Sequence, residues 1–183
     1  MQSRETQRLT LRAFAPSDVD ALYAIQGDRE YMRFTHWSQS REACAAWPQQ
    51  YVDAEPDVGY APWTIVHRAD ARIVGWGGLN IDPNAQEWGP EVSYFIHADY
   101  QGVGLATELV QASVEFGFVD LQLPTIGAFA RPENSGSERV LTKCGFEYVG
   151  YERTLQRNHY ELTHARWRDG RSPAGAADAG ESS

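Results

Sequence analysis

Polar and apolar residues alternate in some segments of the chain and recur at helical spacing in others. Around Leu9, Leu11 and Ala13 the alternation has a period of two, which predicts a strand, whereas the apolar stripe of 102–118 has the spacing of a helix. With turn and capping residues marking the ends, strands are expected at 8–14, 61–68, 72–81, 91–97, 124–130, 146–153 and 155–165, helices at 16–27, 40–54, 102–118 and 135–143, and loops at 55–59 and 82–89.

The order of these expected elements points to a mixed sheet. Strands outnumber helices, and the helices enter at separated points, which favours an α/β (α+β) sandwich over a doubly wound parallel sheet. A chain of 183 residues suits one domain, which we place at residues 1–167. From Arg168 onward Gly, Ala, Ser and Pro dominate without an apolar stripe, so we expect residues 168–183 to form a disordered tail.

Composition narrows the classes of partner. Hydrophobic residues make up 42% of the chain, and 16 Lys and Arg against 25 Asp and Glu give a net charge of −9. This balance argues against a nucleic-acid partner and suits a cationic one. No stretch approaches the roughly 18 apolar residues of a membrane span, and the N-terminus lacks an apolar signal core. We therefore expect no membrane association and a cytoplasmic location.

Neither the cysteines nor the histidines indicate a metal site or a disulfide. Cys44 and Cys144 form no CxxC pair, which is consistent with reduced thiols. The five histidines are scattered along the chain without an HExxH spacing. We therefore expect no bound metal.

The most informative segment joins the strand expected at 91–97 to the helix that follows it. Gly102 and Gly104 stand where that helix begins. The first turn of a helix has unpaired N–H groups and a partial positive charge, and glycine lets an anion come close to them. The segment therefore predicts a cradle for a pyrophosphate; a glycine turn that only reverses the chain is the alternative.

Two other phosphate-binding motifs do not match this turn. A Walker loop requires Gly-Lys-Ser/Thr, but the run Leu105-Ala106-Thr107 follows Gly104 and contains no lysine. A dinucleotide fingerprint follows the first strand of a βαβ unit, whereas about four expected strands precede this turn. The motif is therefore neither of these.

Three motifs together resemble one family. The run Gln101-Gly102-Val103-Gly104-Leu105-Ala106 is similar to the Q/R-x-x-G-x-G/A acetyl-CoA motif of the GNAT superfamily of N-acetyltransferases. The run from Asn134 to Phe146 resembles that family's N-x-x-S…K-x-G-F segment, and Arg8-Leu-Thr-Leu-Arg12 resembles the opening of its RimJ/RimL branch, the ribosomal-protein N-terminal acetyltransferases. The resemblance covers about residues 7–166. It implies the GNAT acyl-CoA N-acyltransferase fold, an α/β/α sandwich with a splayed central strand pair.

The resemblance also implies how acetyl-CoA would bind as the cosubstrate. The backbone N–H groups of 102–107 would hold the pyrophosphate, the strand at 93–97 would pair with the pantetheine arm, and Asn134 would hydrogen-bond to that arm. The residues expected to bind the cosubstrate are Phe95, Ile96, His97, Gln101, Gly102, Val103, Gly104, Leu105, Ala106, Thr107 and Asn134.

Acetyl transfer requires a neutral amine, and therefore a group that accepts its proton directly or through water. Glu91 is the expected base, because it opens the strand that carries the pantetheine contacts and many relatives have a glutamate there. The alternative for Glu91 is a solvated carboxylate at the end of a strand. His97 has a more suitable ordinary pKa, but it is more simply explained as a structural residue at the other end of the strand.

The remaining catalytic groups concern the oxyanion and the leaving sulfur. A backbone N–H near Phe95 or Ile96 is expected to stabilise the oxyanion. Ser137 lies where the RimJ/RimL branch has a serine near the thioester sulfur; helix capping near Asn134 is the alternative. Many relatives have a tyrosine acid four residues before the glycine of the Gly-Phe pair, but this chain has Leu141 there.

The aromatic segment Tyr31–Trp37 corresponds to the variable region that lines the acceptor pocket in relatives. Phe34, His36 and Trp37 are the expected substrate contacts, with packing in the core as the alternative. Further candidate wall residues are Trp76, Trp88 and Tyr160.

The resulting hypothesis is an acetyl-CoA-dependent N-acetyltransferase that acts on a primary amine. The acceptor would be a protein N-terminus or a small amine such as an aminoglycoside, a polyamine or an amino acid. The resemblance also makes a homodimer plausible. The alternative is a non-catalytic acyl-CoA-binding or regulatory module that keeps the fold.

Overall fold

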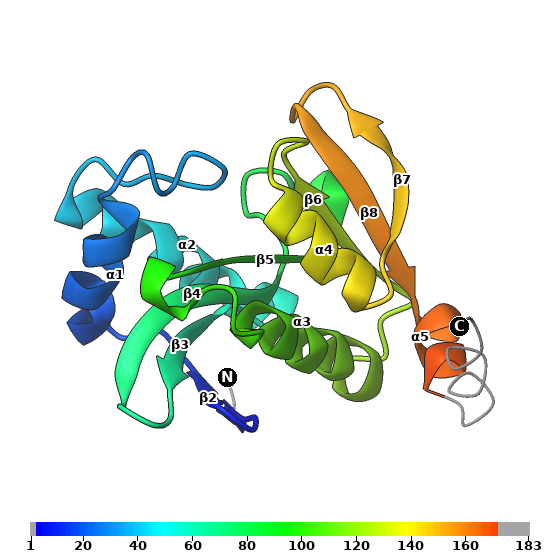
Figure 1. The fold of residues 1–183 in the computed structure, drawn as a ribbon, viewed down its shortest axis with the longest axis horizontal. Coiled ribbons are helices and arrows are strands. Elements are labelled where there is room, and N and C mark those ends of the chain that lie inside the picture. The colour runs from blue at the N-terminus through cyan, green and yellow to red at the C-terminus, as the bar shows by residue number, and fades with distance from the viewer. Residues whose placement is uncertain (1–2, 172–183) are drawn as a thin grey trace, which may run out of the picture.

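The computed structural model describes residues 3–171, which form an eight-stranded sheet with helices on both faces (Figure 1). The strands are β1 (Arg4–Glu5), β2 (Leu9–Arg12), β3 (Trp63–His67), β4 (Arg72–Asn80), β5 (Glu91–Ile96), β6 (Thr125–Ala130), β7 (Glu147–Glu152) and β8 (Arg157–Thr163). The helices are α1 (Val19–Gln26), α2 (Arg41–Val58), α3 (Leu105–Glu115), α4 (Ser135–Lys143) and α5 (His164–Gly170).

The strand order across the sheet is β1-β2-β3-β4-β5-β6-β8-β7. Every neighbouring pair is antiparallel except β5 and β6, which are parallel. The first two helices pack against one face of this sheet, and α3 and α4 pack against the other. The predicted mixed sheet and its α/β/α layering are therefore confirmed.

Strand β5 shows how the alternation of its residues divides the core between the two faces. Val92 and Ile96 are buried beneath α3, with Val110 and Leu105 among their partners. Phe95 is buried on the opposite face, in a cluster with residues of α1 and α2. Successive residues of β5 thus face opposite sides of the sheet, and Phe95 is the apolar residue on a face that also carries Glu91 and Ser93.

The two central strands meet at one end and separate at the other. Strands β5 and β6 pair in register at Glu91 and Gly127, and the Gly127 N–H donates to the carbonyl of Pro90 at 2.8 Å. Beyond this point β6 turns away from β5 together with β8 and β7 (Figure 1). The later residues of β5 therefore have an edge that β6 does not cover, which is the splay expected for the fold.

A buried ion pair fixes the end of β2 to the start of α1. Asp18 is 2% exposed and accepts hydrogen bonds from both terminal nitrogens of Arg12, at 2.7 and 2.8 Å. The N–H of Ala15 and the hydroxyl of Thr64 also donate to it, at 3.0 and 2.9 Å. Burial by itself would raise the pKa of Asp18, but these bonds outweigh it and lower the pKa below its ordinary value.

Helix α2 is longer than the sequence predicted. Residues 55–59 were expected to form a loop because of Pro56, yet the helix continues to Val58 and contains both Pro48 and Pro56. It ends at Gly59, which has a φ of 91° and donates its N–H to the carbonyl of Glu55 at 2.7 Å. The left-handed glycine, and not the proline, therefore ends the helix.

The C-terminal part of the domain also differs from the prediction. The last strand ends at Thr163, whose side chain caps α5 by accepting from the N–H of Arg166 at 3.2 Å. His164 and Trp167 of this helix pack against Phe118, with ring centroids 5.2 and 5.4 Å away. The expectation of disorder from residue 168 is therefore wrong for 168–170, which belong to α5. Residues 172–183 of the expected tail lie outside the described residues.

Among residues 3–171, no helix combines the length and the apolar character that a membrane crossing requires.

Candidate active site

A cleft of about 1060 Å³ opens where β5 and β6 separate. It brings together most of the side chains and backbone groups that the sequence singled out, from the segment before α2, from β5 and from the starts of α3 and α4. The predicted site residues that line it are Phe34, His36, Glu91, Phe95, Ile96, Gln101, Gly102, Gly104, Leu105, Ala106, Thr107, Asn134 and Ser137. A second cavity of about 1080 Å³, between α3 and α5, contains none of them.

The start of α3 has the form of an anion cradle. Gly102 and Gly104 have φ values of 74° and 87°, which a residue with a side chain adopts only with strain. A side-chain carbon on Gly102 would meet no atom within 4 Å, so this part of the turn is open. The first helical bond runs from the N–H of Glu108 to the carbonyl of Gly104, so the N–H groups of 105–107 have no acceptor within the helix.

Gln101 holds the turn against the end of β5. Its side-chain amide donates to the carbonyl of Ile96 at 3.1 Å and also to the hydroxyl of Tyr31. The Tyr31 hydroxyl donates in turn to the same Ile96 carbonyl. Burial, with a smaller contribution from Asp99, raises the pKa of Tyr31 to about 12. Tyr31 thus joins the predicted acceptor segment to the cosubstrate turn, a contact that no sequence pattern indicated.

Three of the predicted residues do not line the cleft. Trp37 donates its indole N–H to the carbonyl of Gly27 at 3.2 Å and lies at the surface, 38% exposed. His97 caps the turn that follows β5 by accepting from the N–H of Asp99 at 3.2 Å. The side chain of Val103 is 59% exposed. None of these three residues is part of the cleft lining, and the contacts expected from the backbone of His97 and Val103 remain predictions.

Glu91 lies half-buried in the cleft, at the point where β5 and β6 meet. Burial, reinforced by the charge of Asp82 and opposed by Arg157, raises the pKa of Glu91 to about 7. Within residues 3–171 no group donates a hydrogen bond to its carboxylate. A carboxylate with this pKa exchanges protons near neutral pH, which suits a general base.

The sequence did not indicate the charged neighbours of Glu91. Asp82 lies in the loop after β4, and Arg157 begins β8; both line the cleft. Burial lowers the pKa of Arg157, while Glu91 and Asp82 oppose that effect. Neither residue lies in a motif, and only the fold brings them to Glu91.

Asn134 and Ser137 occupy the start of α4. Asn134 caps the helix, because its side-chain oxygen accepts from the N–H of Ser137 at 3.2 Å. Its amide nitrogen has no acceptor among the described residues and is available to a ligand. The capping role suggested as the alternative for Ser137 thus belongs to Asn134.

Tyr94 lies next to Ser137 and was not predicted. Its pKa is raised to about 12, mainly by burial, although the Ser137 hydroxyl is close enough to oppose this effect. The buried Tyr94 hydroxyl nevertheless makes no hydrogen bond of regular geometry with the described residues. Leu141, which stands at the position of the family's tyrosine acid, is 1% exposed and packs in the core.

Aromatic rings form the wall of the cleft on the side of α2. His36 stacks on Trp47 with ring centroids 3.8 Å apart, and Tyr51 packs edge-on against Trp76 at 5.2 Å. Burial, followed by the charges of Asp82 and Glu91, raises the pKa of Tyr51, which places this wall near the carboxylates.

Of the three further candidate wall residues, Trp76 lines the cleft as expected and the other two do not. Trp88 packs instead against Phe129 and His159, and Tyr160 packs against Tyr148.

Similar solved structures share this architecture. RimL, the ribosomal L7/L12 alpha-N-protein acetyltransferase, in complex with coenzyme A, has a TM-score of 0.75 at 19% identity, over 88% of this chain and 98% of that one. AAC(6')-Ib in complex with ribostamycin and coenzyme A has a TM-score of 0.76 at 19% identity, over 91% and 99% of the two chains. At these identities the likeness shows the fold.

Sequence comparison identifies the family. The family model described as the acetyltransferase (GNAT) domain matches residues 8–147. The uncharacterized N-acetyltransferase p20 of Bacillus licheniformis is 30% identical over 164 residues, which are 86% of this chain and 89% of that protein. The chain is therefore a member of the GNAT family of acetyltransferases.

Proposed function

We propose that this enzyme transfers the acetyl group of acetyl-CoA to a primary amine in the cleft between β5 and β6, with Glu91 as the proton acceptor. One observation carries the proposal: a carboxylate with a raised pKa and a glycine-lined helix start line the same cleft. The first suits deprotonation of an amine, and the second suits binding of a diphosphate.

The proposed placement of acetyl-CoA follows the groups that the fold leaves without partners. The N–H groups of 105–107 would bind the diphosphate, and the edge of β5 beyond Glu91 would receive the pantetheine arm. The free amide nitrogen of Asn134 would donate to the same arm. RimL and AAC(6')-Ib, which share the fold, are both described in complex with coenzyme A, which supports this placement.

Acetyl-CoA supplies the thioester, and residues of the chain would accept and donate the protons that the reaction moves. At pH 7 an α-amine with a pKa near 7.8 costs about 1 kcal/mol to deprotonate, and a lysine amine costs about 4.6 kcal/mol. Glu91 would accept that proton, directly or through water. The neutral amine adds to the carbonyl carbon of the thioester and gives a tetrahedral oxyanion. When this intermediate collapses, the C–S bond breaks, and the leaving thiolate takes up the second proton that the nitrogen loses.

Two groups on β5 and α4 would stabilise the charges that develop. A backbone N–H of β5 near Phe95 or Ile96 would bind the oxyanion, because the edge of β5 is not covered by β6 there. The Ser137 hydroxyl would hydrogen-bond the leaving sulfur. Its position beside the uncovered strand and the start of α4 supports this role.

The acceptor side favours a cationic amine that carries a ring or an apolar body. Trp47, Tyr51 and Trp76 provide aromatic faces, and Asp82 provides a negative charge beside Glu91. An ammonium group is attracted by both features. An α-amine, as in the RimL reaction that its name describes, and an amine on a small ring compound are the two classes to test first.

A non-catalytic acyl-CoA-binding module is the second candidate, because Leu141 replaces the tyrosine acid. Measurement of thiol release from acetyl-CoA against a panel of peptides, aminoglycosides, polyamines and amino acids separates the two. Amine-dependent release that Glu91→Gln abolishes supports the enzyme proposed here. Tight binding of acetyl-CoA without turnover on any amine would favour the module.

A further inference from the structure

We infer that Arg8, just before β2, is a positioning residue that shapes and charges the diphosphate cradle at the start of α3. The inference rests on the proposed function, since it assumes that coenzyme A binds at this turn. It goes beyond that proposal because Arg8 lies outside the glycine motif and far from it in the sequence.

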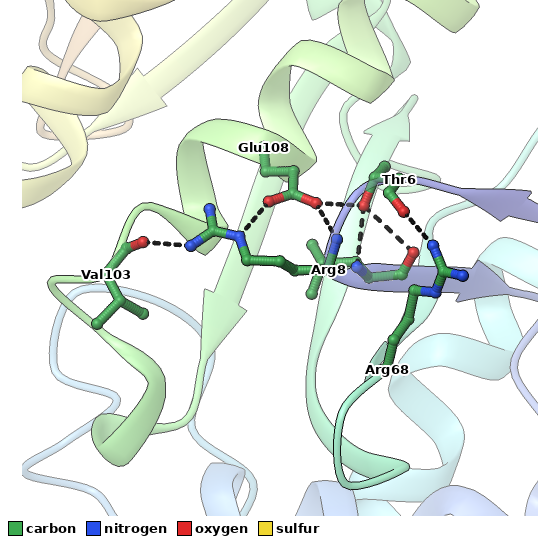
Figure 2. Close-up of polar contacts among 6 residues, drawn as sticks. Thr6, Arg8, Arg68, Val103 and Glu108 are labelled. Carbon is green, nitrogen blue, oxygen red and sulfur yellow. Dashed lines mark hydrogen bonds and ion pairs between the residues drawn. The ribbon is translucent and has the colours of Figure 1, made fainter.

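The first observation is a direct bond between Arg8 and the turn. Its Nη1 donates to the carbonyl of Val103 at 2.7 Å, in the middle of the Gly-Val-Gly run (Figure 2). This bond fixes the direction of the Val103 carbonyl and hence the orientation of the peptide that joins Val103 to Gly104. Both flanking glycines have left-handed φ values, and neither has a side chain that could hold the turn, so the bond from Arg8 is an external tie.

The second observation concerns the charge of Glu108. This carboxylate lies in the first turn of α3, where it would repel a diphosphate bound at the helix start. Arg8 donates to both of its oxygens, from Nε and from the backbone N–H, each at 2.7 Å (Figure 2). Burial would raise the pKa of Glu108, but the bonds from Thr6 and Arg8 lower it, so the group stays ionised and needs compensation.

The third observation is a donor that the protein leaves free. Nη2 of Arg8 makes no hydrogen bond with any described residue, although the guanidinium is held in place by its other nitrogens. A side-chain carbon built on Gly104 would lie 3.4 Å from this nitrogen. The free N–H groups therefore lie beside the glycine that opens α3, where they add positive charge and donors for a phosphate oxygen.

The test compares coenzyme A with pantetheine, which lacks the diphosphate. Calorimetry on Arg8→Met should show the Kd for coenzyme A rising about tenfold or more, as expected for the loss of a charge-assisted contact. The Kd for pantetheine, and kcat with saturating S-acetylpantetheine, should stay within about twofold of the wild-type values. Arg8→Lys keeps the charge but not the fork of donors, so its Kd for coenzyme A should lie between those of the wild type and Arg8→Met.

Arg68→Met is the matched control. Arg68 contacts the same N-terminal segment, donating to the carbonyl of Thr6 at 2.6 Å, but it makes no contact with the turn (Figure 2). This variant should bind coenzyme A as the wild type does. Adding Glu108→Gln to Arg8→Met removes the uncompensated charge and should restore part of the lost affinity.

Equal losses for coenzyme A and pantetheine, or no loss for either, would overturn the inference. If Arg8→Met does not fold, the ratio of the two Kd values in Arg8→Lys decides the question in the same way. Failure of the proposed function has a different signature: the wild-type protein itself would bind no coenzyme A or release no thiol with any amine.

Discussion

Glu91 pairs with Gly127, and within residues 3–171 this is the single register position at which β5 and β6 meet. The proposed base therefore lies at the corner of the opening into which the thioester would be placed. A group at this corner is shielded by both strands, which explains why burial is the main cause of its raised pKa. The feature that splays the sheet would thus also prepare the proposed base for proton transfer.

The first prediction concerns the pH dependence of turnover. With Glu91 titrating at about pH 7, kcat/KM should rise with pH through that value, because the carboxylate is the active form. An acceptor amine with a pKa near 10.4, as in lysine, keeps the two titrations apart and still needs its proton removed. Glu91→Gln should lower kcat/KM by a factor of about 10² or more and remove the rise of kcat/KM near pH 7. A rise near pH 7 that persists in the variant would exclude Glu91 as the base.

A second prediction concerns stability rather than rate. The raised pKa of Glu91 means that the folded protein holds a proton that the unfolded chain loses at its ordinary pKa of 4.5. The free energy of unfolding should therefore fall as pH rises from about 4.5 to 7, and Glu91→Gln should lack this fall. Above pH 7 the variant should be more stable by up to about 3 kcal/mol, measured by urea unfolding. A less stable variant at pH 8 would contradict this account of the pKa.

The third prediction tests the ion pair of Arg12 and Asp18. Asp18→Asn leaves the Arg12 charge without its partner and should cost about 2–3 kcal/mol of unfolding free energy at pH 7. Because the folded-state pKa of Asp18 is lowered, its contribution is present above the ordinary carboxyl pKa and is lost as pH falls through the lowered value. The difference between wild type and variant should thus shrink in acid. A constant difference would refute the charge argument.

The fourth prediction compares two glycines with the same backbone conformation. Gly104 and Gly59 have φ values of 87° and 91°, so aspartate is similarly strained at both. Gly104→Asp also puts a negative charge in the proposed cradle and should weaken coenzyme A binding by about tenfold or more. Gly59→Asp, at the end of α2, should lose stability but bind coenzyme A normally. Equal affinities of the two variants would count against the cradle.

The fifth prediction concerns the leaving sulfur. Ser137→Ala should lower kcat by about two- to tenfold, the value of one hydrogen bond, with an unchanged Kd for coenzyme A. Ser135→Ala is the matched control, because Ser135 begins the same helix without lining the cleft. A kcat for Ser137→Ala equal to that of the control would leave Ser137 without a catalytic role.

The sequence predicted those parts of the site whose residues are contiguous along the chain. The alternation of residues 91–97 predicted β5, the glycines at 102 and 104 predicted the turn before α3, and both together placed Glu91 at the start of the strand that leads to this turn. Asp82 and Arg157 could not be predicted, because they reach Glu91 from a loop and from β8. Burial at the corner of the splay, which sets the pKa of Glu91, likewise depends on packing that no local pattern contains.

The errors at the ends of elements have similar causes. Pro56 predicted the end of α2, but the helix accommodates it and stops one turn later at Gly59. The ring contacts of His164 and Trp167 with Phe118 support a helix that composition alone assigned to a tail. Trp37 was expected in the cleft with its neighbours, but its bond to Gly27 holds it at the surface.

The most direct test of the central claim is a crystal structure of the protein with coenzyme A. The account predicts diphosphate oxygens within hydrogen-bond distance of the backbone N–H groups of 102–107, with the thiol between β5 and β6, near Glu91 and Ser137. Coenzyme A bound in the cavity between α3 and α5, or a diphosphate that makes no contact with the start of α3, would contradict it.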